Sequence, residues 1–167
     1  MNVWLRLVAE KAKFAKRIMV SAGVCFGRKG RLHFIPNTAK VNANLYVETL
    51  LPELVQDCRS VLPSVFIIQP DGAPAHTAKL AQDWTATNCS ECIGKDEWPL
   101  NSPDLNPLDY HVWGAMLECY KSFQPTPENI HELKKILQLI WDQLPHDSIN
   151  KAYTVSQKRG ATFIFFQ

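Results

Sequence analysis

The sequence predicts a mixed α/β domain in which helices flank a sheet, and three observations carry this prediction. Short β-branched and aromatic runs, such as residues 65–69, alternate with longer segments whose apolar residues recur at helical spacing. The chain has 167 residues, which is the usual size of one domain, and 46% of them are hydrophobic, which is enough to build a core. No internal repeat or low-complexity tract interrupts the pattern.

The first predicted elements are two strands and a helix. Residues 18–26 and 32–35 are apolar runs on either side of the glycine-bounded turn at residues 27–30, which is typical of a hairpin. A helix is predicted to begin at Asn42, a good N-cap residue, and to cover one face of the sheet. Its apolar positions at helical spacing are Val47, Leu50, Leu51, Leu54, Val55 and Cys58.

The next predicted elements lead up to an acidic residue. A strand over residues 65–69 ends just before Asp71, and a helix runs from His76 to about Asn88. A short strand is expected at residues 91–93.

Two further helices are predicted in the second half of the chain. Asp109 comes after two prolines and opens an apolar-periodic stretch, so we place it in the first turn of a helix. The last clear helix starts at Thr126-Pro127-Glu128, with Thr126 as its cap, and stops at Pro145.

Asp71 and Asp109 are the candidate catalytic and metal-binding residues. A carboxylate just past the end of a buried strand is held rigidly and faces a crevice, where open α/β sheets place their chemistry. If packing brings the two aspartates together, their oxygens suit Mg²⁺ or Mn²⁺. In the alternative interpretation, Asp71 caps the turn that begins at Gly72, and Asp109 is an ordinary acid at a helix start.

Two sequence blocks around these aspartates resemble the signatures of a known family. Residues 69–76 (QPDGAPAH) and 98–114 (WPLNSPDLNPLDYHVWG) are similar to the two motifs of mariner-type DDE/D transposases, in the same order and with 37 residues between Asp71 and Asp109. The resemblance implies an RNase H-like sheet and metal-dependent DNA cleavage and strand transfer. It also implies that Asp71 is the second catalytic carboxylate and Asp109 the third.

The family's first catalytic aspartate has no counterpart in this chain. In the family it lies on the first strand of the sheet, ahead of the segment that matches residues 17–24, whereas here no aspartate precedes Asp57. We therefore expect an RNase H-like sheet that lacks its first strand, a weakly bound or lost Mg²⁺ or Mn²⁺, and no efficient catalysis. The N-terminal DNA-binding region of the family is also expected to be missing.

Two other functions stay open. In one, the chain is an active nuclease or transposase whose site is completed by Glu10 or by a partner chain. In the other, it is an interaction module that binds intact transposase as a dimer partner.

The positive charge is concentrated near the N-terminus. Residues 1–31 hold eight basic side chains and one acidic one, for a net +7, although the whole chain carries only +2. Such a cluster predicts salt-dependent, sequence-independent DNA binding, and a solvated basic surface is the alternative. The candidate DNA-binding residues are Lys11, Lys13, Lys16, Arg17, Arg28, Lys29, Arg31 and His76. For His76, a packed structural role is the alternative to DNA contact.

We divide the chain into a basic segment (1–16), a partial transposase domain (17–152) and a divergent apolar tail (153–167). The tail is expected to pack over a sheet edge or to bind another chain. Five cysteines without a framework spacing favour reduced thiols, and the Cys89-Ser90-Glu91-Cys92 pair is only half of a zinc site. We expect a nuclear protein. We expect no membrane partner, because no apolar run is long enough to span a bilayer.

Overall fold

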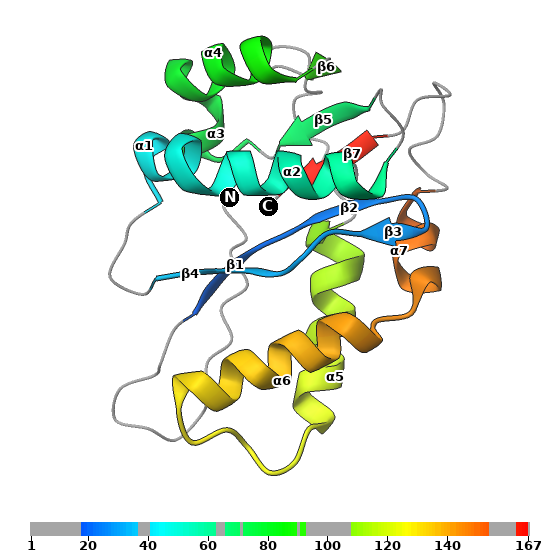
Figure 1. The fold of residues 1–167 in the computed structure, drawn as a ribbon. Coiled ribbons are helices and arrows are strands. Elements are labelled where there is room, and N and C mark those ends of the chain that lie inside the picture. The colour runs from blue at the N-terminus through cyan, green and yellow to red at the C-terminus, as the bar shows by residue number, and fades with distance from the viewer. Residues whose placement is uncertain are drawn as a thin grey trace.

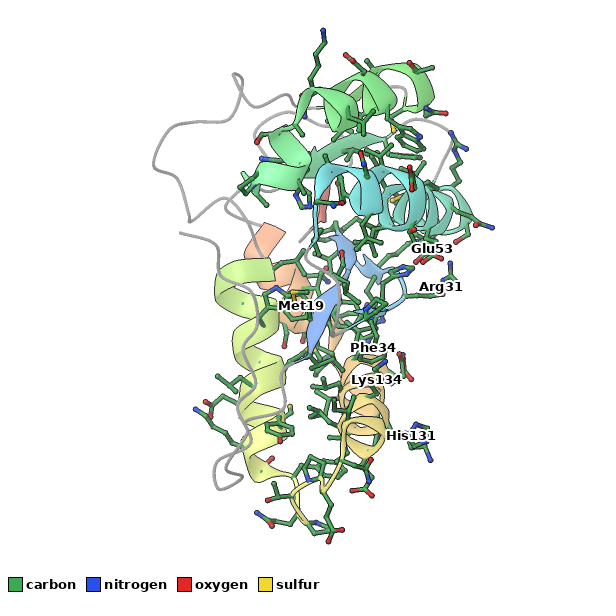
Figure 2. The ribbon with its side chains drawn as sticks, turned by 90° about the vertical axis from the view of Figure 1, so that its left-hand side faces the viewer. Met19, Arg31, Phe34, Glu53, His131 and Lys134 are labelled. Atoms are coloured by element: carbon green, nitrogen blue, oxygen red, sulfur yellow. The ribbon has the colours of Figure 1, made fainter. Side chains whose placement is uncertain are left out.

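The computed structural model describes residues 18–36, 41–62, 66–70, 72–89, 91–92, 108–153 and 163–166. Its strands form a two-stranded sheet of order β1-β4 and a five-stranded sheet of order β3-β2-β7-β5-β6. Helices α2 to α4 gather on one side of the β1 to β4 strands, and α5 and α6 lie on the other (Figure 1; Figure 2 gives the perpendicular view). The predicted mixed α/β fold with flanking helices is confirmed.

The N-terminal strands form the predicted hairpin with a tighter turn. β1 (Met19–Ser21) pairs antiparallel with β4 (His33–Ile35), and β2 (Gly23–Cys25) pairs with β3 (Arg28–Lys29). The reversal occurs at Phe26 and Gly27, where Gly27 has φ +69°, a conformation that glycine adopts without a steric penalty. The prediction that residues 27–30 are all turn is therefore wrong for Arg28 and Lys29, which continue the strand.

The helix predicted from Asn42 is present but contains a wider turn. It consists of α1 (Ala43–Leu45), the π-helical turn η1 (Tyr46–Leu50) and α2 (Leu51–Val61). The predicted cap is confirmed, because Asn42 Oδ1 accepts a hydrogen bond of 2.9 Å from Leu45 N. Pro52 supplies the physical reason for the wide turn: it has no N–H, and its ring clashes with the carbonyl four residues back in a regular helix.

The helix predicted from His76 to Asn88 is broken into two pieces. α3 (Pro74–Thr77) and α4 (Lys79–Asn88) are separated by Ala78, whose backbone is extended at ψ 143°. Before them lies β5 (Ile67–Pro70), and after them β6 (Glu91–Cys92) forms the short strand that was predicted.

From residue 108 onward, the described residues contain four helical segments. They are the π-helical turn η3 (Leu108–Val112), α5 (Trp113–Ser122), α6 (Ile130–Gln143) and α7 (His146–Tyr153). The prediction that Thr126 caps α6 is wrong: the cap is Asn129, whose Oδ1 accepts a hydrogen bond of 2.9 Å from Glu132 N. α7 was not predicted.

The last strand, β7 (Phe163–Phe166), lies in the middle of the larger sheet. It runs antiparallel to β2 and parallel to β5, between these two strands (Figure 1). The expectation that the apolar tail packs over a sheet edge is therefore wrong, because β7 has a neighbour on each side. Because β7 lies between β2 and β5, the sheet has no gap at this position.

One apolar core joins the sheet to the helices on both sides. Leu51 and Leu54 of α2, Ile68 of β5, and Met116 of α5 are each at most 1% exposed. Within the described residues, no helix is long and apolar enough to cross a membrane. The core therefore fixes the end of β5, which Asp71 follows, and the turn η3, which contains Asp109.

Candidate functional site

Asp71 comes between two described elements. β5 ends at Pro70, and its last three residues are buried, while Gly72 after the aspartate is exposed and α3 begins at Pro74. Asp71 itself lies outside the described residues. The structure therefore confirms the strand that leads to the aspartate, and the position of its carboxylate stays a prediction.

Asp109 is the second residue of η3. Its backbone belongs to a π-helical turn, a conformation often found at functional sites. Leu108 and Val112, at the two ends of this turn, are 0% exposed, so the turn is anchored in the core. The side chain of Asp109 is not described, and the distance between the two aspartates therefore stays a prediction.

His76 is packed inside the molecule. Its side chain is 4% exposed, and its ring centroid lies 4.1 Å from that of Tyr46 at an interplanar angle of 32°. A side chain in this position does not reach a nucleic acid at the surface. The prediction that His76 contacts DNA directly is therefore corrected to the packed role.

Lys29 caps a helix. Its Nζ donates hydrogen bonds to the backbone carbonyls of Trp141, Asp142 and Leu144, at the C-terminus of α6. A cation at this end of a helix also interacts favourably with the helix dipole. Burial lowers the pKa of Lys29, and the charge of Asp142 acts in the opposite direction. The ammonium of Lys29 therefore binds carbonyl groups of the protein, whereas the sequence had predicted that it contacts DNA phosphates.

Two arginines of the predicted DNA-binding group are exposed. Arg28 lies on β3, and the side chain of Arg31 is 66% exposed although its Nε donates to Asp57 Oδ1 at 2.7 Å. Lys11, Lys13, Lys16 and Arg17 lie outside the described residues. Among the described members of the predicted group, Arg28 and Arg31 are therefore the ones that fit a surface contact with phosphates.

A cluster of ionisable residues that the sequence did not reveal joins β4 to α2. His33 is 8% exposed, and its Nδ1 and Nε2 lie 2.9 Å from Glu53 Oε2 and from Asp57 Oδ2, respectively. Asp57 also accepts a hydrogen bond of 3.0 Å from Arg31 N. Arg31 and Glu53 lie on the same side of the molecule in Figure 2. The available signal was the four-residue spacing of Glu53 and Asp57, which places both on one helix face.

The environment of Asp57 favours its charged form. Burial acts to raise the pKa of its carboxyl, but hydrogen bonds from His33 and Arg31 and the positive charge of Arg31 together hold it below its ordinary value. The cluster therefore acts as a charged clamp between the sheet and α2. In the described part of the chain, no group of three or more histidine, cysteine, aspartate or glutamate side chains is arranged so that it could hold a metal ion.

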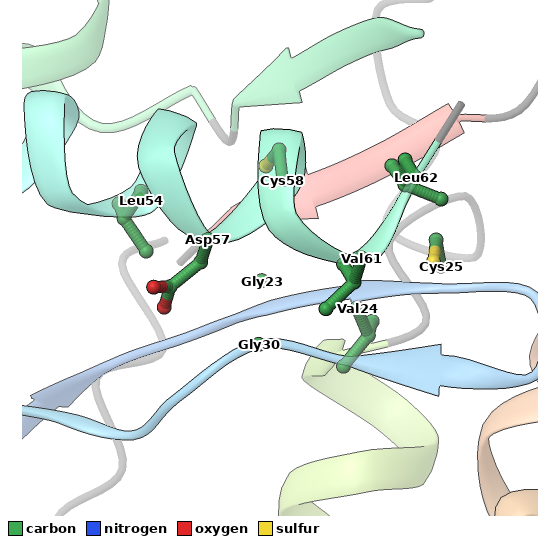
Figure 3. A pocket seen from close by; sticks show the side chains of 9 residues that line it. All are labelled: Gly23, Val24, Cys25, Gly30, Leu54, Asp57, Cys58, Val61 and Leu62. Atoms are coloured by element: carbon green, nitrogen blue, oxygen red, sulfur yellow. The ribbon is translucent and has the colours of Figure 1, made fainter. Parts of the chain in front are cut away.

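Of two pockets that Asp57 borders, one is small. It lies between α2 and the β2–β3 hairpin and is lined mainly by apolar residues, with Asp57 at its margin (Figure 3). Its volume of about 10 Å³ is at the lower limit for one water molecule. It does not suit a larger ligand.

The cysteines are free thiols, of which Cys25 and Cys58 are buried, Cys89 and Cys92 are partly buried, and Cys119 is exposed. None of the five is in a disulfide, as predicted. Burial raises the pKa of Cys25 to about 11, and burial together with Cys92 raises that of Cys89 to about 11. A raised pKa disfavours the thiolate, the reactive form of a cysteine, in the metal-free chain.

The chain is similar in sequence to two nematode transposases. The Tc3 transposase of Caenorhabditis elegans is 24% identical over 152 residues, which cover 87% of this chain and 44% of that protein. The Tcb1 transposase of Caenorhabditis briggsae is 28% identical over 87 residues, or 52% of this chain and 30% of that protein. The chain thus spans less than half the length of these relatives. No protein-family model matches it.

The fold is similar to that of solved mariner transposase structures. The catalytic domain of the Mos1 mariner transposase aligns with a TM-score of 0.69 and 22% identity, over 83% of this chain and 68% of that domain. The Mos1 paired-end complex with Mn aligns with a TM-score of 0.70 and 22% identity, over 88% of this chain and 43% of that one. Together with the sequence matches, these alignments confirm the resemblance to mariner-type transposases that the two motif blocks predicted.

Proposed function

We propose that this chain, a relative of mariner-type transposases, is a nucleic-acid-binding domain derived from a DDE/D transposase. One observation carries the proposal. Asp71 follows β5 and Asp109 lies in η3, within two motif blocks of a chain that aligns with the Tc3 transposase along 87% of its length. We further propose that the sheet is RNase H-like, which the mixed strand directions and the helices on both sides support.

The proposed site would hold Mg²⁺ or Mn²⁺ through Asp71 and Asp109. Carboxylate oxygens are the donors that these hard cations prefer, so the chemistry of the two side chains fits the ions. Bound in a pair, such ions activate the attacking oxygen and stabilise the leaving oxygen of a phosphodiester. The solved Mos1 complex that contains Mn supports this choice of metal.

We propose that catalysis by this chain is weak or lost. Two aspartates provide less negative charge and fewer ligands than the three carboxylates of the family. Their role is then confined to orienting a weakly held ion beside the DNA backbone. In the nucleus, the proposed compartment, the chain would bind DNA, and intact transposase or a second copy is the proposed protein partner.

The basic N-terminal region is the proposed DNA contact. Residues 1–31 carry a net +7, and Arg28 and Arg31 extend this charge onto the exposed surface of the hairpin. Lys29 and His76 are left out of this interface, because the first caps α6 and the second is buried. Binding through phosphates alone is insensitive to base sequence and weakens as salt competes.

The test is the salt dependence of duplex DNA binding. Replacing Lys11, Lys13, Lys16 and Arg17 with alanine removes four cations, so we expect the slope of log affinity against log salt to fall by up to about 3 to 4 units. Replacing Lys79, Lys121, Lys134 and Lys135 removes the same charge elsewhere and serves as the matched control. Equal slopes for the two quadruple variants would show that net charge, and not the N-terminal cluster, governs binding.

A further inference from the structure

The turn at the tip of the β2–β3 hairpin carries an aromatic side chain on the surface. Cys25 of β2 pairs with Arg28 of β3, so Phe26 and Gly27 form the turn. Phe26 is 53% exposed, although large apolar side chains are usually buried. Two-residue turns favour glycine, asparagine and aspartate. These preferences account for Gly27, whose φ is +69°, but not for a phenylalanine at position 26.

Two helices hold this turn in place. Gly27 N donates a hydrogen bond of 2.7 Å to Asn150 Oδ1 of α7, which lies beside the tip of the hairpin (Figure 1). Lys29 Nζ donates to backbone carbonyls at the C-terminal end of α6, including that of Asp142 at 3.1 Å. A turn that is already anchored loses little backbone freedom when a ligand binds to it. The ring of Phe26 can therefore contact a ligand at a low entropic cost.

An exposed cation follows Phe26 closely in the sequence. Arg28 is exposed at the start of β3, and residues 1–31 together carry a net +7. Proteins that bind single-stranded nucleic acids combine these two features, because cations hold the phosphates while aromatic rings stack on the bases. In a duplex, the faces of the bases are already stacked on one another. An exposed ring near a cation therefore fits an unpaired base better than a paired one.

We propose that Phe26 is a base-stacking residue: an unpaired base of single-stranded DNA lies against its ring, while Arg28 contacts a neighbouring phosphate. This inference rests on the proposed DNA binding and adds to it a contact with the bases of a single strand. All four bases have an aromatic face, so stacking on Phe26 requires no particular base sequence. Part of the affinity for a single strand therefore depends on its bases, and the rest depends on its phosphates.

The first experiment compares two single-stranded probes of equal length, oligothymidylate and a chain of tetrahydrofuran abasic units, which carries the same phosphates but no bases. Phe26→Ala in the full-length chain should lower the affinity for oligothymidylate by at least about fivefold and leave the affinity for the abasic probe unchanged. Phe26→Trp should retain both affinities, because an indole ring also stacks on a base. Leu80→Ala is the matched control: it removes a side chain that is 46% exposed on α4 and should change neither affinity.

The second experiment locates the base directly. 5-Iodouracil in place of one thymine forms a covalent cross-link under ultraviolet light with an aromatic ring that is stacked on it, and mass spectrometry of the digested protein identifies the residue. We expect a cross-link at Phe26 in the unchanged chain and none at position 26 in Phe26→Ala.

Three outcomes would overturn the inference: Phe26→Ala weakens the binding of both probes equally, it weakens the binding of neither, or the cross-link forms only at other residues. In each of these the unchanged chain still binds DNA, so the proposed function stands. An unchanged chain that binds neither probe would overturn the proposed function as well.

Discussion

At the scale of single residues, Asp57 links three parts of the fold. Its carboxylate accepts hydrogen bonds from Arg31 N, Arg31 Nε and His33 Nε2, and it is 8% exposed. Replacing Asp57 with alanine leaves these donors without their acceptor, so we expect the free energy of unfolding to fall by about 2 kcal/mol at neutral pH. Urea titration of the unchanged chain and the variant measures this difference in the free energy of unfolding. Glu53→Ala is the control, because the side chain of Glu53 is 49% exposed and its loss should cost less than about 1 kcal/mol.

The same carboxylate predicts a dependence on pH. Because the pKa of Asp57 is lower in the folded chain than in the unfolded chain, its ionised form stabilises the fold at every pH above the unfolded value of about 3.9. This contribution is lost as the pH falls through the folded pKa. The stability difference between the unchanged chain and Asp57→Asn should therefore shrink below about pH 4. A difference that stays constant down to pH 2 would contradict the charged clamp.

Two adjacent cations are expected to have different roles. Lys29 bonds to carbonyls at the end of α6, whereas Arg28 is exposed. Lys29→Met should lower the free energy of unfolding by about 1 kcal/mol without changing the salt dependence of DNA binding. Arg28→Met should change the salt dependence and leave stability nearly unaffected. Thermal unfolding measures the stability of the two variants, and DNA titration at several salt concentrations measures their salt dependence. If Lys29→Met changes the salt dependence and Arg28→Met does not, Lys29 belongs to the DNA-binding surface.

Sequence patterns predicted most individual elements but fewer of their ends. The Asn42 cap is encoded locally, because an asparagine directly precedes an apolar-periodic run. The extended conformation of Ala78 lacks such a signal, since alanine favours helices in isolation. The wide turn before Pro52 could have been anticipated from that proline alone. Tertiary packing decides the places where local propensity is neutral or misleading.

The start of α6 provides the test at the scale of elements. Asn129 Oδ1 accepts from Glu132 N, and Glu132 Oε2 accepts from Glu128 N at 2.8 Å, so two backbone donors at the helix start are satisfied. Asn129→Ala should lower the free energy of unfolding by about 1 kcal/mol. Thr126→Ala changes the residue that the sequence pattern favoured and should have little effect. If Thr126→Ala is the more destabilising change, α6 begins earlier in solution.

At the scale of the whole molecule, the centre of the larger sheet could not be predicted. An apolar run such as residues 163–166 indicates a strand, but nothing in it specifies partners that lie 96 and 143 positions away along the chain. The site differs in this respect. Asp71 and Asp109 were identified from motifs, and the structure supports the elements next to them, while the arrangement of the two carboxylates stays a prediction.

The last prediction is that this chain alone does not cut or join DNA at a useful rate. No aspartate precedes Asp57, and Asp57 is held by Arg31 and His33, so it is not a free third metal ligand beside Asp71 and Asp109. With only two carboxylates, the attacking and leaving oxygens lose their shared electrostatic clamp, and the reaction returns toward its slow uncatalysed barrier. The assay is cleavage of labelled linear and supercoiled DNA in Mg²⁺ and in Mn²⁺. Cleavage that disappears in Asp71→Ala would show that the site is complete. Glu10→Gln then identifies the missing ligand: loss of cleavage in this variant would point to Glu10, and unchanged cleavage would point to a partner chain.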